Sequence, residues 1–360
     1  MRKLSLITIV LLLSIACNRV DTKKIEVKKP KNIILLIGDG MGVTQIYAAM
    51  SVAEKPLNIE KFKHIGFHKT YSANDYVTDS GAGGTALSTG KKTCNHCIAV
   101  DSTGKPFKTI LEYAEENDLA TGLVSTSSIV HATPASFIAH VPDRYDYEDI
   151  ALDFLDVDID LFIGGGKKQF ENREDNLNLI DSLKKNQYNI IDGWQNINPE
   201  DDGKFAVFTA EEHNLDYRLG RGDMLPVSTE KAIQILNKND KGFFLMVEGS
   251  MIDWGGHDQD IDYVTSELMD FDNTVAKALD FAKKDGETLV IVTADHETGG
   301  LTITDGDMKN KTIIANFSTD HHTSVMVPVF AYGPGAEEFG GIYENTEVFE
   351  KMMKAFDFEK

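Results

Sequence analysis

Residues 32–40 read Asn-Ile-Ile-Leu-Leu-Ile-Gly-Asp-Gly, an apolar run that stops at a carboxylate between two glycines. Near-continuous apolar runs of this kind are typical of strands buried on both faces of a parallel sheet. Other runs that end as abruptly in polar residues lie at 121–124, 243–247, 289–292 and 327–332. Helical patterns occur at 107–117, 228–239 and 262–284. This alternation predicts an α/β fold, doubly wound, with a mainly parallel central sheet and helices on both faces.

The composition is that of a globular protein, with 42% hydrophobic and 26% charged residues in a chain of 360. The formal net charge is −21. This charge argues against nucleic-acid binding, which requires a basic face to release counterions. If the substrate is an anion, bound metal ions must reverse the local field at the site.

The N-terminus predicts export. Met1-Arg2-Lys3 precedes an apolar run, 4–15, that is too short to span a membrane, as in a signal peptide. A small residue directly before Cys17 favours lipoprotein processing, with simple secretion as the alternative. We therefore expect a signal peptide over 1–17, a tether over 18–30 and a single catalytic domain over 31–360. The mature protein would be periplasmic or anchored to the outer membrane by lipid at Cys17.

Cys94 and Cys97 are spaced C-x-x-C in a polar loop. In an exported protein this spacing favours a local disulfide. A zinc site would need a second cysteine pair, which the sequence lacks.

Acidic and imidazole groups follow one predicted strand after another. They are Asp39, Glu248, Asp253, Asp295 and His296. Ligands of doubly wound sheets bind at the carboxyl ends of the strands, so these groups are predicted to converge. Residues 160–166 read as a further strand entering a glycine turn. The polar segment 170–225 is expected to pack over the sheet.

The spacing of these residues favours metal binding. Asp253 and His257 are four residues apart and could share one helical face. Asp39 lies among glycines that allow a close approach, and no phosphate-loop motif surrounds it. The pair His321-His322 could also bind metal, and the alternative is that both are ordinary surface residues. Aspartate, glutamate and histidine ligands without cysteine suit zinc, an all-oxygen subset suits magnesium, and two adjacent ions suit phosphoryl transfer.

Ser80 is the candidate nucleophile. It follows Thr78-Asp79 and precedes Gly81-Ala82-Gly83, which reads as the start of a helix. A helix N-terminus favours an anion or a developing alkoxide, and a metal ion lowers a hydroxyl pKa without a histidine base. A serine that merely caps the helix is the alternative.

Together and in this order, the motifs resemble the alkaline phosphatase family over about 31–336. The resemblance implies hydrolysis of phosphate monoesters through a phosphoserine at Ser80, with Arg144 gripping the phosphate. It also implies two zinc ions and one magnesium ion. The implied ligands are Asp253, His257 and His322 for one zinc, Asp39, Asp295, His296 and Ser80 for the second, and Asp39, Thr133 and Glu248 for magnesium.

The chain departs from the best-studied bacterial members at two places. His131 stands near the magnesium where they have aspartate, and Trp254 stands where they have lysine. Imidazole favours zinc over magnesium, so the third ion could be either. The loss of the lysine predicts weaker retention of product phosphate. The short interval between His296 and His322 leaves little room for the family's crown-like subdomain.

Two alternatives to a monoesterase stay open at this point. A phosphodiesterase or phosphonate hydrolase of the same superfamily shares the two-zinc core but generally lacks Thr133, Glu248 and Arg144 together. A non-catalytic, metal-binding surface lipoprotein would need neither Ser80 nor Arg144. The expected partners are small phosphate monoesters, and a homodimer is one option for the oligomeric state.

Overall fold

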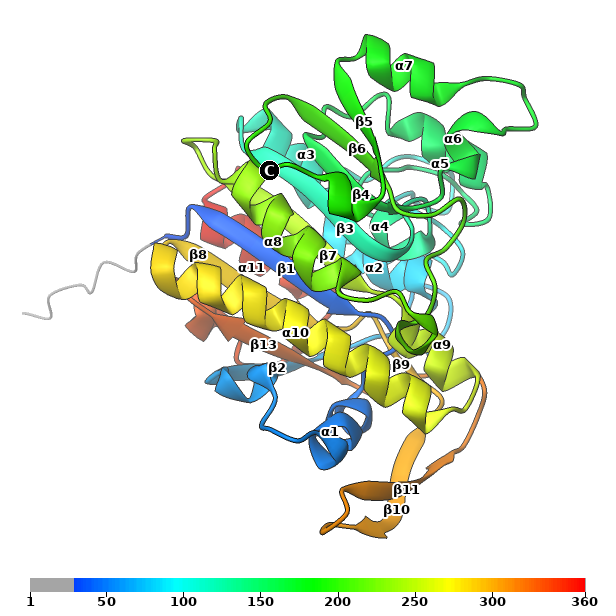
Figure 1. Ribbon diagram of the computed structural model, residues 1–360, viewed down its shortest axis with the longest axis vertical. Helices are drawn as coiled ribbons and strands as arrows, with labels where there is room; N and C mark the ends of the chain where they lie inside the picture. The colour runs from blue at the N-terminus through cyan, green and yellow to red at the C-terminus, as the bar shows by residue number, and fades with distance from the viewer. Residues whose placement is uncertain (1–28, 360) are drawn as a thin grey trace, which may run out of the picture.

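A computed structural model describes residues 29–359 of the chain (Figure 1). The predicted signal peptide, the lipidation site at Cys17 and residues 18–28 of the tether lie outside the described residues. Within the described part, no helix has both the length and the apolar composition needed to cross a bilayer.

The fold is built on one ten-stranded sheet in the described residues. In spatial order its strands are β14 (Gly341–Glu344), β2 (His64–Lys69), β13 (Val327–Tyr332), β8 (Thr288–Thr293), β1 (Asn32–Gly38), β7 (Phe243–Gly249), β3 (Ala120–Ser128), β4 (Leu161–Gly165), β6 (Lys204–Phe208) and β5 (Tyr188–Asp192). Only β13 runs antiparallel to its neighbours, β8 and β2. The predicted mainly parallel α/β sheet is therefore confirmed.

Strand β1 explains why the opening run decides the fold. All seven of its residues are buried, and successive side chains enter opposite cores. Leu35 packs with Met246 on one face, and Leu36 packs with Val247 on the other. A strand covered on both faces needs apolar residues at every position. Each fully buried leucine or isoleucine contributes about 1.5–3 kcal/mol, so Leu35→Ala would cost about 2–5 kcal/mol of stability.

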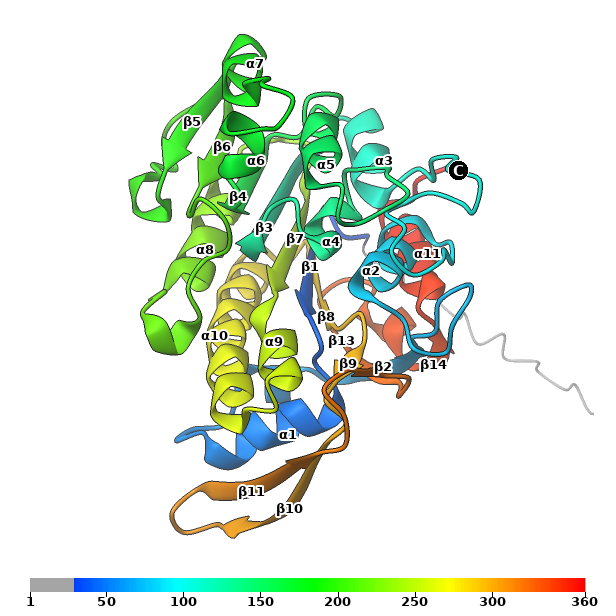
Figure 2. The same ribbon diagram turned by 90° about the vertical axis from the view of Figure 1, so that its right-hand side faces the viewer.

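Helices cover both faces of the sheet, as Figure 2 shows from the side. One layer comprises α1 (Val43–Val52), α8 (Met224–Leu236), α9 (Met251–His257) and α10 (Ile261–Asp285). The other comprises α2 (Ser80–Thr89), α3 (Ile110–Glu116), α4 (Ala132–Ala135), α5 (Tyr147–Asp153), α6 (Lys168–Glu171), α7 (Leu179–Lys185) and α11 (Thr346–Phe356). The predicted helices at 107–117, 228–239 and 262–284 thus form, as α3, α8 and α10.

Helix α10 matches its sequence pattern most closely. The Asp260 side chain accepts hydrogen bonds from the first-turn N–H groups of Asp262 and Tyr263, and Gly286 ends the helix in the left-handed conformation. Both are preferred ends. The apolar stripe packs onto the sheet, so the prediction from spacing holds along its whole length.

The expectation that the segment 170–225 packs over the sheet is wrong. Its strands β6 and β5 instead extend the sheet at one edge, in register with β4. The run 205–208 is short and entirely buried, and it pairs in parallel with β4. Because polar residues flank this short apolar run on both sides, the sequence pattern does not predict the strand.

Short irregular elements complete the described chain. The 3-10 helices are η1 (Asn58–Lys61), η2 (Trp194–Asn196), η3 (Tyr217–Leu219) and η4 (Ala336–Phe339). Between His296 and His322 lie β9 (Glu297–Thr298), which pairs with β12 (His322–Thr323), and the hairpin β10 (Leu301–Asp307) with β11 (Thr312–Phe317). The hairpin projects beyond α1 (Figures 1 and 2). This small hairpin occupies the interval that the sequence marked as short.

Candidate metal centre and nucleophile

The predicted site residues meet at the carboxyl edge of the three central strands. Asp39 follows β1, Glu248 lies in β7, and Asp295 follows β8, while β1 pairs with both of the other strands. Asp39 N–H donates to the carbonyl of Gly249 at 3.1 Å, which ties the first two strand ends together. The convergence expected from a doubly wound sheet is therefore present.

Glycine at position 40 allows this close packing. Its φ of +72° is left-handed, and a Cβ there would lie 2.7 Å from the Asp253 Cα. Gly83 in α2 is as tightly placed, since a Cβ would approach the Asp295 Cβ at 3.0 Å. Small residues thus let α9 and the nucleophile helix reach the strand ends.

Ser80 is the first residue of α2 and is buried. The helix is capped by Asp79, not by Ser80, because Asp79 Oδ1 accepts the Ala82 N–H at 2.9 Å. The capping alternative for Ser80 is therefore wrong, and its hydroxyl is left for other contacts. Ser80 Oγ lies 3.3 Å from His296 Nε2.

One group of candidate ligands comprises Asp39, Asp295 and His296. Their ligand atoms all lie within 4.8 Å of one another. His296 Nε2 is 3.5 Å from Asp39 Oδ1 and 3.3 Å from Asp295 Oδ2. The other oxygen of Asp295 accepts the N–H of Gly40 at 3.3 Å, which orients the carboxylate.

A second group gathers around Asp253. His257 and His322 each place Nε2 3.4 Å from Asp253 Oδ1, and the two Nε2 atoms are 3.1 Å apart. The Nδ1 atoms of these histidines face backbone carbonyls, of Asp320 at 2.6 Å and of Thr78 at 2.9 Å. Such contacts fix a ring and direct its second nitrogen to a metal. His322 thus lies in the site and not on the surface.

The electrostatics of the cluster fit bound cations. Burial and the carboxylates of Asp295, Asp253 and Glu248 raise the pKa of Asp39 well above its ordinary value. Burial and Asp253 likewise raise the pKa of Asp295 to about 7. Buried carboxylates are costly when unpaired.

Several buried ligand atoms also lack a hydrogen-bond partner among residues 29–359. They are Asp39 Oδ1, Asp295 Oδ2, Glu248 Oε1 and His131 Nδ1. Metal ions would satisfy these atoms and offset the negative charge, so the residues present fit such ions.

The residues proposed for the third ion lie beside Asp39. Thr133 Oγ1 is 3.4 Å from Asp39 Oδ2, and Ser125 Oγ donates to Glu248 Oε2 at 2.6 Å. Burial and the charge of Arg144 lower the pKa of His131 to about 3, so its imidazole is neutral. A neutral imidazole can serve as a metal ligand.

Arg144 faces the nucleophile helix. Its Nη1 donates to Asp79 Oδ2 at 3.0 Å, and its Nη2 lies 3.5 Å from His131 Nε2. Burial opposes the charge, but Asp79 and Asp39 raise the pKa of Arg144 above its ordinary value. The guanidinium is thus a fixed cation near Ser80.

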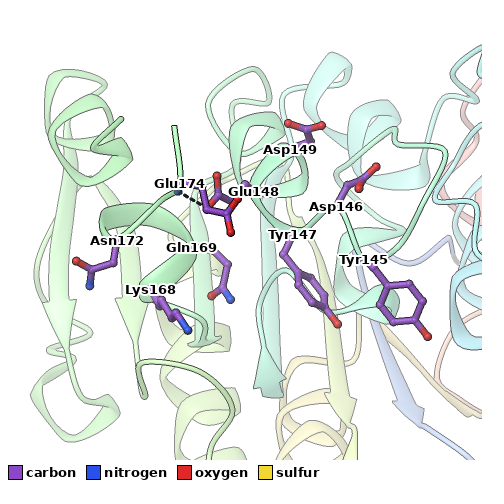
Figure 3. A pocket seen from close by; sticks show the side chains of 9 residues that line it. All are labelled: Tyr145, Asp146, Tyr147, Glu148, Asp149, Lys168, Gln169, Asn172 and Glu174. Atoms are coloured by element: carbon purple, nitrogen blue, oxygen red, sulfur yellow. Dashed lines mark hydrogen bonds between the residues drawn. The ribbon is translucent and has the colours of Figure 1, made fainter. Parts of the chain in front are cut away.

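Several of these residues line one cavity of about 410 Å³. Its lining includes Ser80, Arg144, His131, Trp254 and the second group of ligands. A second cavity, of about 360 Å³, shares Tyr145 with the first and is lined mainly by acidic and polar side chains of 146–149 and 168–174 (Figure 3). The second cavity contains none of the candidate site residues, so the first cavity is the candidate reaction chamber.

Two further residues, Asp79 and His213, lie at the site without a sequence pattern that predicts them there. Asp79 directly precedes Ser80, and the signal that could have found it is that an aspartate before small residues is a common helix cap. His213 packs edge-to-face against His131 and Trp254, with ring centroids 5.5 and 4.9 Å away. His213 comes from the 170–225 segment, where no periodic signal marked it.

The disulfide predicted between Cys94 and Cys97 is not formed, and both are free cysteines in the described chain. Their residues form a hydrogen-bonded turn in which Cys97 N–H donates to the Cys94 carbonyl at 3.1 Å. Burial raises the pKa of the Cys97 thiol, which lies against Thr93. The reduced pair is therefore compatible with the local fold.

The sequence model of the family described as alkaline phosphatase matches residues 30–317 and 305–358. The chain is 36% identical over 425 aligned positions to alkaline phosphatase 3 of Bacillus subtilis (strain 168), covering 94% of this chain and 91% of the relative. Among solved structures, it is 44% identical to the alkaline phosphatase of the Antarctic bacterium TAB5, with a TM-score of 0.89. That match covers 93% of this chain and all of the other.

A variant of the TAB5 enzyme is equally similar, with 44% identity, a TM-score of 0.88 and the same coverage of both chains. In that variant a histidine is replaced by aspartate, and magnesium is bound in the M3 site.

Proposed function

The chain belongs to the alkaline phosphatase family and hydrolyses phosphate monoesters, and we propose that it does so through a phosphoserine formed at Ser80. The observation that carries this proposal is the buried Ser80 hydroxyl 3.3 Å from His296 Nε2, beside the Asp39–Asp295–His296 group. The diesterase, phosphonatase and non-catalytic alternatives lose support, because the relatives are alkaline phosphatases.

The proposed reaction has two displacements. The Ser80 oxygen attacks phosphorus in line, the bond from phosphorus to the alcohol oxygen breaks, and the alcohol leaves with a proton. Water then attacks the phosphoserine, which releases inorganic phosphate and restores the hydroxyl. The positive end of α2 and the fixed guanidinium of Arg144 stabilise the phosphoryl oxygens in both steps. Two inversions leave the configuration at phosphorus unchanged.

We propose that the site holds two zinc ions and a third ion. Asp253, His257 and His322 would hold one zinc, and Asp39, Asp295, His296 and Ser80 the other. When bound, such ions lower the pKa of a hydroxyl and stabilise charge on the attacking and leaving oxygens. Buried ligand atoms without a hydrogen-bond partner in residues 29–359 support this assignment.

The third ion would be held by Asp39, Thr133 and Glu248, with His131 beside it. We propose that His131 biases this position toward zinc over magnesium, because imidazole prefers the softer ion. In the TAB5 variant that has aspartate in place of a histidine, magnesium is bound in the M3 site. This supports the proposal that the identity of the third ion depends on whether histidine or aspartate lies near it.

The remaining proposals concern the cellular setting. Residues 31–360 would form one catalytic domain, exported by the signal peptide and held at the membrane by lipid on Cys17. Mass spectrometry of the mature N-terminus would detect the lipid, and light scattering would distinguish a homodimer from a monomer.

The decisive experiment is Ser80→Ala. We expect kcat for a monoester to fall by roughly a thousandfold or more, since loss of a nucleophile removes the covalent path. Zinc content should stay close to that of the unmodified enzyme, and acid quenching should trap phosphoserine only where Ser80 is present. Retained hydrolysis in the alanine variant would overturn the proposal.

A further inference from the structure

The turn 94–97 reaches the rim of the reaction chamber without belonging to the metal site. Cys97 N–H bonds to the Cys94 carbonyl at 3.1 Å, and His96 between them has a φ of +75°. A left-handed residue other than glycine is strained and persists only where its surroundings hold it. Asn95 and His96 both line the cavity that contains Ser80.

Asn95 secures the residues directly before the nucleophile. Its side-chain oxygen accepts the N–H of Asp79 at 3.2 Å, and its amide nitrogen donates to the carbonyl of Val77 at 2.9 Å. One side chain therefore holds both ends of the segment that leads into α2.

His96 joins Asp79 and Arg144 through its backbone. Its N–H donates to Asp79 Oδ2 at 3.0 Å, and its carbonyl accepts the N–H of Arg144 at 2.7 Å. The same Asp79 oxygen accepts Arg144 Nη1 at 3.0 Å. The spacing between Asp79 and Arg144 thus depends on the conformation of His96.

The two cysteines at the ends of the turn are close enough to be joined. A hydrogen-bonded four-residue turn brings its end Cα atoms within about 7 Å, and a disulfide needs about 4.4–6.8 Å. Both cysteines are free and half-buried in the described chain, beside a cavity that opens to solvent. A small thiol oxidant can therefore reach them.

We propose that the Cys94–Cys97 turn is a positioning element for Asp79 and Arg144, and that the oxidation state of its thiols sets how tightly phosphate is held. The inference rests on the proposed role of Arg144. In the oxidation, each thiol gives up one proton and one electron, the S–S bond forms, and a disulfide such as oxidised glutathione is reduced to two thiols. The closed turn samples fewer conformations, so less conformational entropy is lost when phosphate binds.

The test compares reduced and oxidised full-length enzyme with its metals bound. Oxidised glutathione closes the pair, and the loss of two hydrogens by mass spectrometry verifies closure. We expect the Kd of phosphate, measured by calorimetry, to be about fivefold lower for the oxidised enzyme than for the reduced enzyme. A fivefold change is at the lower end of the range typical for coupling between two sites. KM for a monoester should fall with the Kd, and kcat should change less. The doubly substituted Cys94→Ser, Cys97→Ser enzyme should not respond to the oxidant.

Two substitutions at His96 test the positioning role without oxidation. His96→Gly and His96→Val both remove the imidazole and keep the backbone contacts available, but only glycine adopts positive φ freely. We expect the glycine enzyme to bind phosphate several times more tightly than the valine enzyme. Equal affinities in this pair would overturn the proposal, as would an unchanged Kd after verified closure, a pair that stays open in excess oxidant, or a response of the double serine enzyme. Because phosphate affinity is read without turnover, these outcomes are distinct from failure of the phosphoserine mechanism.

Discussion

The imidazole rings of His296 and His322 stack, with centroids 3.6 Å apart and planes inclined by 20°. The two residues come from opposite ends of the 297–321 excursion that contains the β10–β11 hairpin. His296 Nε2 faces Asp39 and Asp295, whereas His322 Nε2 faces Asp253 and His257. The stack therefore joins the two groups of candidate ligands into one site, as two adjacent metal ions would require.

The stability of the metal-free protein should decline as pH rises above about 6.5, where the His131 imidazole, with a pKa of about 3 in the folded protein, is neutral in both the folded and the unfolded state. Asp295 has a pKa of about 7 in place of 3.8, so the folded protein retains a proton that the unfolded chain releases between these values. The hydrogen bond to Asp253 raises the pKa of His257 from 6.5 to about 9, and its contribution is lost as pH rises through that interval. Both effects lower the free energy of unfolding with increasing pH.

Urea unfolding in chelator and in zinc, at pH values across this range, measures the effect. Zinc should flatten the pH dependence and raise stability, because it binds the folded state. If the free energy of unfolding changes with pH by the same amount with and without zinc, the assignment of these residues as ligands is contradicted.

Arg144→Ala should lower kcat/KM for a monoester by about 100- to 10,000-fold. In the proposed role, the guanidinium would supply two charge-assisted hydrogen bonds to phosphate, each worth about 1.5–3 kcal/mol. Arg144→Lys should recover only part of the loss, since an ammonium cannot form the paired bonds. Steady-state kinetics and the inhibition constant of phosphate measure both variants. Full activity in the lysine variant would exclude bidentate binding.

His131→Asp should raise the affinity of the third site for magnesium by about tenfold, the scale of changes beside metal ligands. The carboxylate replaces a neutral imidazole whose Nδ1 has no hydrogen-bond partner within the described chain. Elemental analysis after dialysis against both ions reports the metal content. His131→Asn is the control, because asparagine is similar in size to aspartate but carries no charge. Equal magnesium binding by the two variants would show that the negative charge at this position does not determine magnesium affinity.

Trp254→Lys should strengthen inhibition by phosphate about fivefold, because a cation near the anion adds about 1 kcal/mol in a solvated cavity. Trp254 lines the reaction chamber and packs against His213 and His131. Trp254→Leu separates the loss of the ring from the gain of charge. If the leucine variant binds phosphate as tightly as the lysine variant, charge is not the cause.

The sequence predicted the central strands and the convergence of their polar ends because each strand, such as β1, is a continuous apolar run. The same rule could not find β6, whose flanks are polar, or His213, which reaches the site from an irregular loop. Asp79 was also missed, since its contact with Arg144 joins positions far apart in the chain.

The free state of Cys94 and Cys97 was beyond sequence reasoning for another reason. Their spacing permits a disulfide, a turn with two thiols or a redox pair. Only the placement of Asn95 and His96 against Asp79 and Arg144 shows what the turn holds.

The proposed ligands are distributed from Asp39 near the start of the described chain to His322 near its end. A polypeptide emerging from the ribosome or an export channel acquires its last ligand only when most of its length is available. If these residues are the ligands, catalytic competence arrives late in biosynthesis, after β8 has joined β1 and residues 297–321 have folded. Fragments truncated before His322 would be inactive even with a complete nucleophile helix.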